Sequence, residues 1–155
     1  YRVGALYQEL GEVGLPNSYL HALNYYDKAL KISESRKNPK EQARIYDQIG
    51  LIRMAEGNYR EAVQTFERAV ALALSVKAPN VVNQIYFHLY LCNQKKGNFK
   101  EALSYYQLYA ELSEQLLEDK LKHQKELVQR ESAENRKQFI ISKTEQMIAD
   151  QEMDT

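Results

Sequence analysis

The motif Gly57-Asn58-Tyr59-Arg60-Glu61-Ala62 stands near the middle of this 155-residue chain and sets its period. It recurs as Gly97-Asn98-Phe99-Lys100-Glu101-Ala102 and, more loosely, as Asn17-Ser18-Tyr19-Leu20-His21-Ala22, so that the three alanines stand 40 residues apart. Pro39 and Pro79 keep the same step. A fixed period of about 20 to 50 residues is typical of stacked units, each of which buries its apolar face on the next.

Apolar residues at spacings of three and four, interrupted by glycine, asparagine and proline, predict the helices. We expect three helix pairs, with helices at residues 1–13, 18–36, 40–56 and 59–76, a fifth from about 80, and a sixth from 99. Gly57 and Gly97 are expected to end the first helix of the second and third pairs, and Gly11, Gly14 and Pro16 to close the first helix with a turn. Ser18 is expected to cap the second helix. The tyrosines expected to pack in the core are Tyr26, Tyr46, Tyr86 and Tyr106.

No glycine or proline follows Gly97, so residues 116–155 are predicted to form one long polar helix. A helix of this polarity either stands in solvent, supported by i,i+4 charge pairs, or pairs with another helix. It is a candidate coiled coil or connector, and it would allow a homodimer. The apolar residues expected to support self-association are Leu117, Leu121, Val128, Phe139, Ile140 and Ile141.

Acidic and basic residues balance at 21 each, giving a formal net charge of zero. No global field would therefore draw the chain to nucleic acid or to an anionic membrane. The sequence has no apolar run of about 18 residues and no signal peptide at its start, which predicts no membrane segment in these residues and favours a cytoplasmic protein. The chain begins at Tyr1 without methionine, so this prediction does not extend to targeting signals outside these residues.

Catalytic, metal-binding and cofactor-binding motifs are not found, so we expect no enzyme, no metal site and no cofactor. The histidines, His21, His88 and His123, are far apart in the sequence. There is no His-Glu-x-x-His motif, no pair of cysteines, and no glycine-rich phosphate loop. The single Cys92 falls on a predicted buried helix face, which indicates packing rather than a reactive thiol.

These repeats resemble the tetratricopeptide repeat, whose units are two antiparallel helices with small residues at close crossings. Units of that family usually have about 34 residues. With its 40-residue repeat, this chain resembles the long-repeat branch of the family, which includes cell-polarity adaptors and bacterial regulators. The resemblance implies an all-α, right-handed solenoid at residues 1–115, with repeats at about 2–36, 40–77 and 80–115. It rests on Tyr46, Ile49, Gly50, Gly57, Tyr59, Ala62, Phe66, Ala69 and Pro79.

In that family the first helix of each pair lines a concave groove that holds a peptide or a partner helix. Taking Gly11, Gly50 and Tyr90 as equivalent positions, the resemblance implies a protein-binding or peptide-binding groove. An apolar strip within it would be formed by Leu51, Met54, Phe87 and Leu91. The other groove residues would be Gln8, Glu12, Arg44, Asp47, Gln48, Gln84, His88 and Gln94.

A weaker resemblance concerns residues 105–109 and the polar run after them, which look like the sensory regions of bacterial signalling proteins. It implies the sensing or docking part of a signalling regulator, with the last helix mediating dimerisation or signal transfer. The alternative is a scaffold similar to the cell-polarity adaptors, in which the last helix is only a linker. A nucleic-acid-binding role ranks third.

Overall fold

Six α-helices and no strand make up the part of the chain that the computed structural model describes, residues 2–14 and 17–153. The contacts divide the chain into two units, Tyr1–Glu114 and Gln115–Thr155, so that the last helix begins in the first unit and continues in the second. The predicted all-α solenoid followed by a long helix is confirmed. The helices are α1 (Arg2–Glu12), α2 (Ser18–Ser35), α3 (Pro39–Ala55), α4 (Tyr59–Ser75), α5 (Pro79–Lys96) and α6 (Phe99–Met153).

The turns within the second and third pairs depend on glycine. Gly57 and Gly97 have φ angles of 80° and 85°, in the left-handed region that glycine adopts without steric cost. Both end their helices as the sequence predicts. In the first pair, Gly11 lies inside α1, Gly14 has a φ angle of 85° in the turn that follows, and Pro16 lies outside the described residues.

The turns between pairs also repeat, although no glycine marks them. Lys37 and Lys77 stand 40 residues apart and have φ angles of 50° and 51°. In both turns the backbone N–H of the next residue donates to the carbonyl oxygen five residues earlier, at 3.0 Å. Satisfying these carbonyls offsets part of the cost of a left-handed lysine.

The helix starts use proline at two places and a side-chain cap at one. Pro39 and Pro79 open α3 and α5, where the missing N–H of proline has no intrahelical partner to lose. The side chain of Asn38 caps α3 by accepting a hydrogen bond from the N–H of Glu41 at 3.1 Å. For α2 the cap position belongs to Asn17, and Ser18, predicted as the cap, is the first helical residue.

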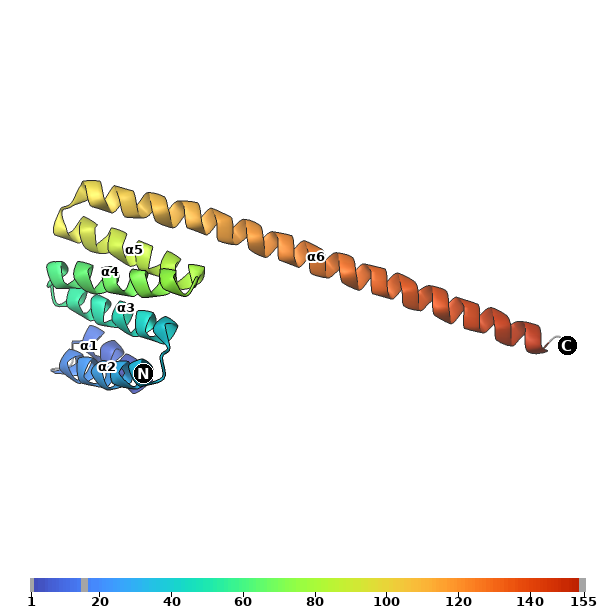
Figure 1. The fold of residues 1–155 in the computed structure, drawn as a ribbon, viewed down its shortest axis with the longest axis horizontal. Coiled ribbons are helices and arrows are strands. Elements are labelled where there is room, and N and C mark those ends of the chain that lie inside the picture. Colours follow the sequence, from blue (N-terminus) through green and yellow to red (C-terminus); the bar gives the residue numbers. More distant parts are fainter. Residues whose placement is uncertain (1, 15–16, 154–155) are drawn as a thin grey trace. The chain divides into compact units, whose positions relative to one another are not determined.

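Two clusters of buried side chains hold the first unit together. The first cluster joins α2 to α3 through Ala22, Tyr26, Ile45 and Ile52. From α2 to α5 the helices lie side by side in chain order, which places each pair against the next (Figure 1). The second cluster lies among α3, α4 and α5 and contains Ala43, Ala62, Phe66, Ala69, Ala73, Ala78, Val81, Val82, Ile85, Leu89 and Cys92.

The four tyrosines expected in the core differ in their burial. Tyr26 is fully buried, and Tyr46 and Tyr86 are half-buried against the second cluster. Tyr106 is exposed, so that prediction is wrong. The reason is positional, because the outer side of α6 has no further helix pair packed on it within the described residues.

Gly50 fits against an aromatic ring of its own pair. A Cβ atom added to Gly50 would lie 2.5 Å from Cε1 of Phe66, closer than any carbon contact allows. Phe66 is fully buried, so its ring has little room to withdraw. The small residue is therefore required by the ring on α4.

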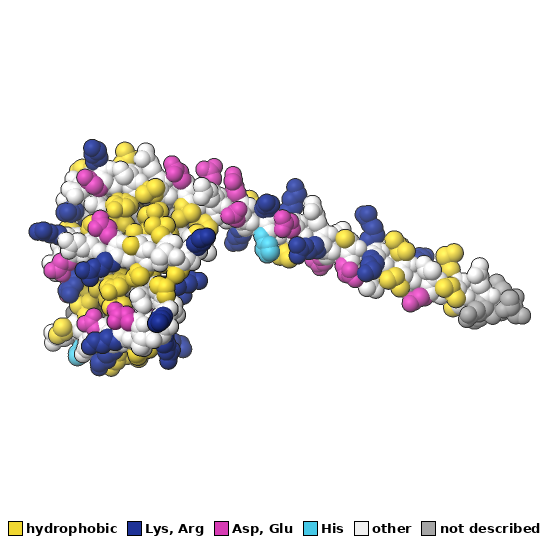
Figure 2. Space-filling view, viewed as in Figure 1, with side chains coloured by type: hydrophobic (Ala, Val, Ile, Leu, Met, Phe, Trp, Pro, Cys, Tyr) yellow, Lys and Arg dark blue, Asp and Glu magenta, His cyan; other side chains and the backbone are white. Residues whose placement is uncertain are grey.

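The second unit is a helix with almost no buried side chain. Every described residue from 115 to 149 is exposed except Leu116, and hydrophobic side chains alternate with charged ones along it (Figure 2). Within that range the structure records no ion pair, and Gln138 donates one side-chain hydrogen bond to Glu134 at 3.0 Å. The i,i+4 charge pairs considered from the sequence thus give this segment no recorded support.

We expect Gly50→Ala to lower the free energy of unfolding by about 1–3 kcal/mol, because the added methyl group overlaps the Phe66 ring. At an open helical position the same exchange would stabilise by up to about 1 kcal/mol. Urea denaturation followed by circular dichroism measures the difference. In a Phe66→Leu background the penalty should shrink, and an equal penalty in both backgrounds would contradict the proposed contact.

Candidate functional site

The twelve residues predicted to line the groove all lie on α1, α3 and α5, the first helices of the three pairs. We call this set the predicted groove face. Its members differ in accessibility, which decides which of them a partner can reach. The exposed ones are Glu12, Arg44, Gln84 and Gln94; the half-buried ones are Gln48, Leu51, Met54, Phe87, His88 and Leu91; the buried ones are Gln8 and Asp47.

Asp47 is the buried polar centre of this face, with a relative exposure of 2%. Its Oδ1 accepts a hydrogen bond from Nδ1 of His88 at 2.7 Å, and its Oδ2 accepts one from Nε2 of Gln84 at 3.1 Å. A carboxylate oxygen accepts hydrogen bonds, so the Nδ1 proton of this contact is assigned to the histidine. A buried carboxylate without donors would be costly, and these two bonds therefore tie α5 to α3.

His88 also contacts the third helix of this region. Its ring lies 5.7 Å from the ring of Phe66 on α4, at a tilt of 38°. One imidazole thus joins α3 through Asp47 and α4 through Phe66 while it belongs to α5. The contacts of His88 with Asp47 and Phe66 therefore fix the register of α3, α4 and α5 beside the predicted groove face, and both of these partners are buried.

Gln8 does not face a partner as predicted. It is buried, and its Oε1 accepts a hydrogen bond from the hydroxyl of Tyr26 at 2.9 Å. The bond links α1 to the tyrosine of α2 that lies in the first core cluster. Gln8 is therefore a packing residue between α1 and α2.

The cause of this error is the register of α1. A Cβ atom on Gly4 would lie 3.0 Å from the ring of Tyr26, just as one on Gly50 meets the ring of Phe66. Gly4 is thus the counterpart of Gly50, whereas the sequence analysis gave that place to Gly11. A Cβ atom on Gly11 would instead lie 2.5 Å from the ring of Tyr19. The alignment by Gly11 is therefore offset by seven residues, and α1 meets α2 in the register in which α3 meets α4.

The predicted apolar strip is only partly accessible. Leu51 and Met54 are half-buried and pack against the second core cluster. The ring of Phe87 lies 5.1 Å from that of Tyr109 on α6, so one side of it is covered. Leu91 is half-buried as well. These four side chains form an apolar floor beside the exposed polar residues of the face.

Four aromatic rings of α5 and α6 form a cluster that the sequence analysis did not identify. The centroid of Tyr106 lies 5.2 Å from that of Tyr90 and 6.1 Å from that of Tyr109, and Phe87 lies 5.9 Å from Tyr90. Tyr90 and Tyr109 each stand 40 positions after a small residue, a departure visible in the sequence. What the sequence does not show is that the four rings meet.

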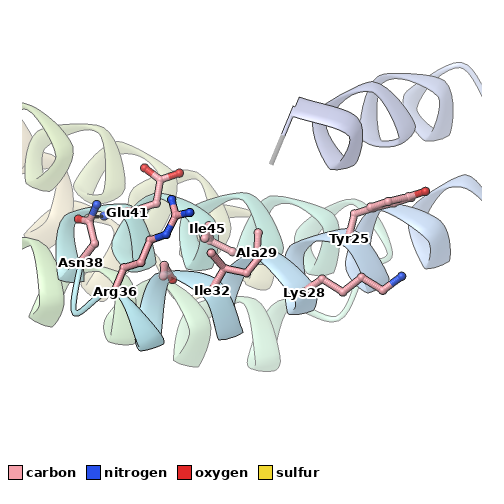
Figure 3. A pocket seen from close by; sticks show the side chains of 9 residues that line it. Tyr25, Lys28, Ala29, Ile32, Arg36, Asn38, Glu41 and Ile45 are labelled. Atoms are coloured by element: carbon pink, nitrogen blue, oxygen red, sulfur yellow. Dashed lines mark hydrogen bonds between the residues drawn. The ribbon is translucent and has the colours of Figure 1, made fainter.

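A cavity of about 390 Å³ opens between α2 and α3, outside the predicted groove face. Its floor is apolar, from Ala29, Ile32 and Ile45, and the long side chains of Lys28 and Arg36 extend along its rim (Figure 3). Ile32, expected on the apolar stripe of its helix, is exposed here. None of the twelve predicted residues lines this cavity.

The cavity corresponds to a region that is closed in the next pair. Forty positions after Ala29, Ser33 and Ile45 come three core residues of the second cluster, all fully buried. In that pair α3, which packs against α4, has 17 residues, and in the first pair α1 has 11. The cavity thus lies in the place that these core residues fill in the next pair.

Chemistry at Cys92 is disfavoured by its surroundings. Burial raises the pKa of its thiol to about 11, and the nearby Lys96 only partly opposes this. Its Sγ lies 3.5 Å from the carbonyl oxygen of Tyr59. In residues 2–14 and 17–153 the structure contains no group of three His, Cys, Asp or Glu side chains placed to hold a metal ion. No helix of this part combines the length and apolarity needed to cross a membrane.

Comparisons with known proteins agree with this architecture. The family model described as Tetratricopeptide repeat matches residues 43–75, which cover most of α3 and all of α4. The chain is similar to the crystal structure of the TPR domain of FLU from Arabidopsis, with a TM-score of 0.60 and 22% identity over 74% of this chain and 97% of that one. At this identity the likeness concerns the fold. No curated protein matches the chain.

We expect Asp47→Asn to lower the free energy of unfolding by about 1–3 kcal/mol, because an amide offers His88 and Gln84 one uncharged oxygen in place of two charged ones. Chemical denaturation measures the loss. The matched control is Arg44→Ala, an exposed change on the same helix that should stay within about 0.5 kcal/mol of the parent. Equal effects of the two substitutions would refute the anchoring role of Asp47.

Proposed function

We propose that this chain, which has the fold of a tetratricopeptide repeat domain and matches the family model at residues 43–75, binds a segment of a partner protein along the predicted groove face. Proteins of this fold serve as interaction modules, and the face on α1, α3 and α5 combines exposed polar groups with an apolar floor. Binding at such a face uses pockets for side chains and hydrogen bonds to the partner backbone.

The observation that carries the proposal is the buried anchor at Asp47. Its two hydrogen bonds hold Gln84 and His88 in place before any partner arrives. A preformed surface loses less conformational freedom on binding than a loose one, which favours affinity. A fixed Gln84 also keeps part of its exposed amide available for a partner backbone.

The chemistry of the face indicates the kind of segment that fits it. Arg44 is exposed, and a guanidinium group can donate hydrogen bonds to a partner's carboxylate. Leu51, Phe87 and Leu91 offer half-buried apolar surface. A segment that alternates apolar side chains with an acidic one matches both features. With a net charge of zero, the chain has no long-range field that would replace these short-range contacts.

We further propose that the chain is the sensing or docking part of a signalling regulator, and that α6 mediates self-association. The exposed residues Leu117, Leu121 and Val128 support this, because a polar helix without recorded charge pairs gains stability from a second helix. A scaffold without a signalling role is the alternative. Such a scaffold would still bind a partner at the predicted groove face, but its α6 would not pair with the α6 of a second copy.

Peptide display against the purified chain tests the groove. Peptides enriched by selection should bind the Arg44→Glu variant at least about tenfold more weakly, a loss of about 1.4 kcal/mol measured by calorimetry. Arg68→Glu is the matched control, since Arg68 is an exposed arginine on α4, away from the predicted groove face, and the same charge is reversed. We expect it to leave the affinity unchanged.

Two results would count against the groove. One is a selection that enriches nothing over an unrelated helical protein. The other is a set of peptides whose affinity falls equally with Arg44→Glu and Arg68→Glu, which would indicate binding governed by overall charge.

Light scattering behind size exclusion tests self-association through α6. Changing Leu117, Leu121 and Val128 together to glutamate should reduce a dimeric mass to a monomeric one, because it removes the apolar contact while keeping good helix formers. The control changes Gln115, Gln129 and Gln138 to glutamate, which adds the same charge without removing apolar surface. A monomeric parent, or equal effects of both triple variants, would disprove pairing through these three residues.

A further inference from the structure

A second cavity, of about 380 Å³, lies where α2, α3 and α4 meet, which we call the first junction. Its apolar part is formed by Leu30 and Ile49, which pack against the first core cluster. Asp27, Tyr46 and Thr65 also line it, one from each of the three helices. None of the twelve residues of the predicted groove face lines this cavity, so it is separate from the site proposed above.

The same arrangement recurs 40 residues later where α4, α5 and the start of α6 meet, which we call the second junction. An acidic residue on the first helix and a tyrosine on the second are kept. The residue on the third helix differs, because a threonine in the first junction becomes a tyrosine in the second. The corresponding pairs are Asp27 and Glu67, Tyr46 and Tyr86, and Thr65 and Tyr105.

In the second junction the side chain of Tyr105 occupies the place between the other two. Its ring centroid lies 6.3 Å from that of Tyr86, at a tilt of 37°. Its hydroxyl donates a hydrogen bond to Oε1 of Glu67 at 3.5 Å. Burial and then the charge of Glu67 raise the pKa of this hydroxyl, so it keeps its proton and stays a donor. The chain itself therefore shows which group fits between a tyrosine ring and a carboxylate at this place.

In the first junction no ring of the third helix reaches this place. The hydroxyl of Thr65 donates to the carbonyl oxygen of Glu61 on its own helix, at 2.7 Å. Tyr46 is half-buried, and Asp27 is exposed. Within residues 2–14 and 17–153 the structure records no hydrogen bond or ion pair for the Asp27 carboxylate. The cavity thus keeps both contacts that hold Tyr105 in the second junction.

We propose that the cavity at the first junction binds the phenol ring of a tyrosine from a partner protein, against Tyr46 and with its hydroxyl donating to Asp27. The volume falls within the range of small-ligand sites, and tilted aromatic pairs attract one another beyond the effect of area burial. Asp27 and Glu61 both line the cavity, and two carboxylates repel a phosphate group. The ligand is therefore an unmodified tyrosine and not a phosphotyrosine.

The probe for this site is p-cresol, the side chain of tyrosine without its backbone. Titration into the isotope-labelled full chain, followed by amide chemical shifts, should give saturable changes confined to α2, α3 and α4. Toluene has the same ring without the hydroxyl and should bind about fivefold more weakly, because it cannot donate to Asp27. The exposed change Asp27→Ala should remove this preference for p-cresol and leave the fold unchanged, which circular dichroism checks.

Thr65→Tyr supplies the missing ring from within the chain. It should weaken p-cresol binding at least about tenfold, since the new side chain takes the place that Tyr105 takes in the second junction. Thr144→Tyr is the matched control. Thr144 is exposed on α6, and its hydroxyl donates to the carbonyl oxygen four residues earlier at 2.8 Å, as that of Thr65 does. This control adds the same ring away from the cavity and should leave the affinity unchanged.

N-acetyl-tyrosinamide carries the ring on a peptide backbone and should bind at least as tightly as p-cresol. Binding of p-cresol without binding of N-acetyl-tyrosinamide overturns a partner protein as the source of the ring. The absence of saturable shifts at the first junction overturns the site itself. So do equal affinities of the Thr65→Tyr and Thr144→Tyr variants for p-cresol, or a preference over toluene that survives Asp27→Ala.

Discussion

The contact between the ring of Phe66 and the bare backbone of Gly50 is the constraint on which the second pair depends. The ring fills the space that any side chain at Gly50 would need, and in doing so it becomes a fully buried surface for the next helix. The ring of His88 packs against this ring and is hydrogen-bonded to Asp47. The hydrogen bonds of Asp47 therefore depend on the packing of Phe66 against Gly50. Packing at the glycine thus determines where the exposed groups of α3 and α5 stand.

Much of the fold follows from the 40-residue period. The period predicts the helix pairs, and the helix bounds differ from the structure by a residue or two. Gly57 and Gly97 take the left-handed backbone that their place in the repeat requires. Lys37 and Lys77 also adopt the left-handed backbone, although no glycine in the sequence marks these turns. The turns satisfy carbonyl groups at the end of the preceding helix, which offsets the steric cost of this backbone conformation.

The candidate site was less predictable, for two physical reasons. Periodicity gives the face on which Asp47 lies but not its depth, which depends on how closely α5 approaches and on partners about 40 residues away in the sequence. The place of Gln8 was misjudged because repeats were aligned by sequence, whereas α1 ends at Glu12 and α2 begins only at Ser18. The longer connection brings Gly4, and not Gly11, opposite Tyr26, and apolar spacing alone does not reveal this offset of seven residues.

The separation of the two core clusters has a consequence for how the molecule opens. Chains whose units contact only their neighbours behave as one-dimensional arrays, in which stability is a sum of local terms and the ends are weakest. The α1–α2 pair is joined to the rest mainly through one small cluster and lies beside an uncovered cavity. Amide protons there should therefore exchange with solvent before those of α3 to α5, and a single unfolding midpoint would average over events of different stability.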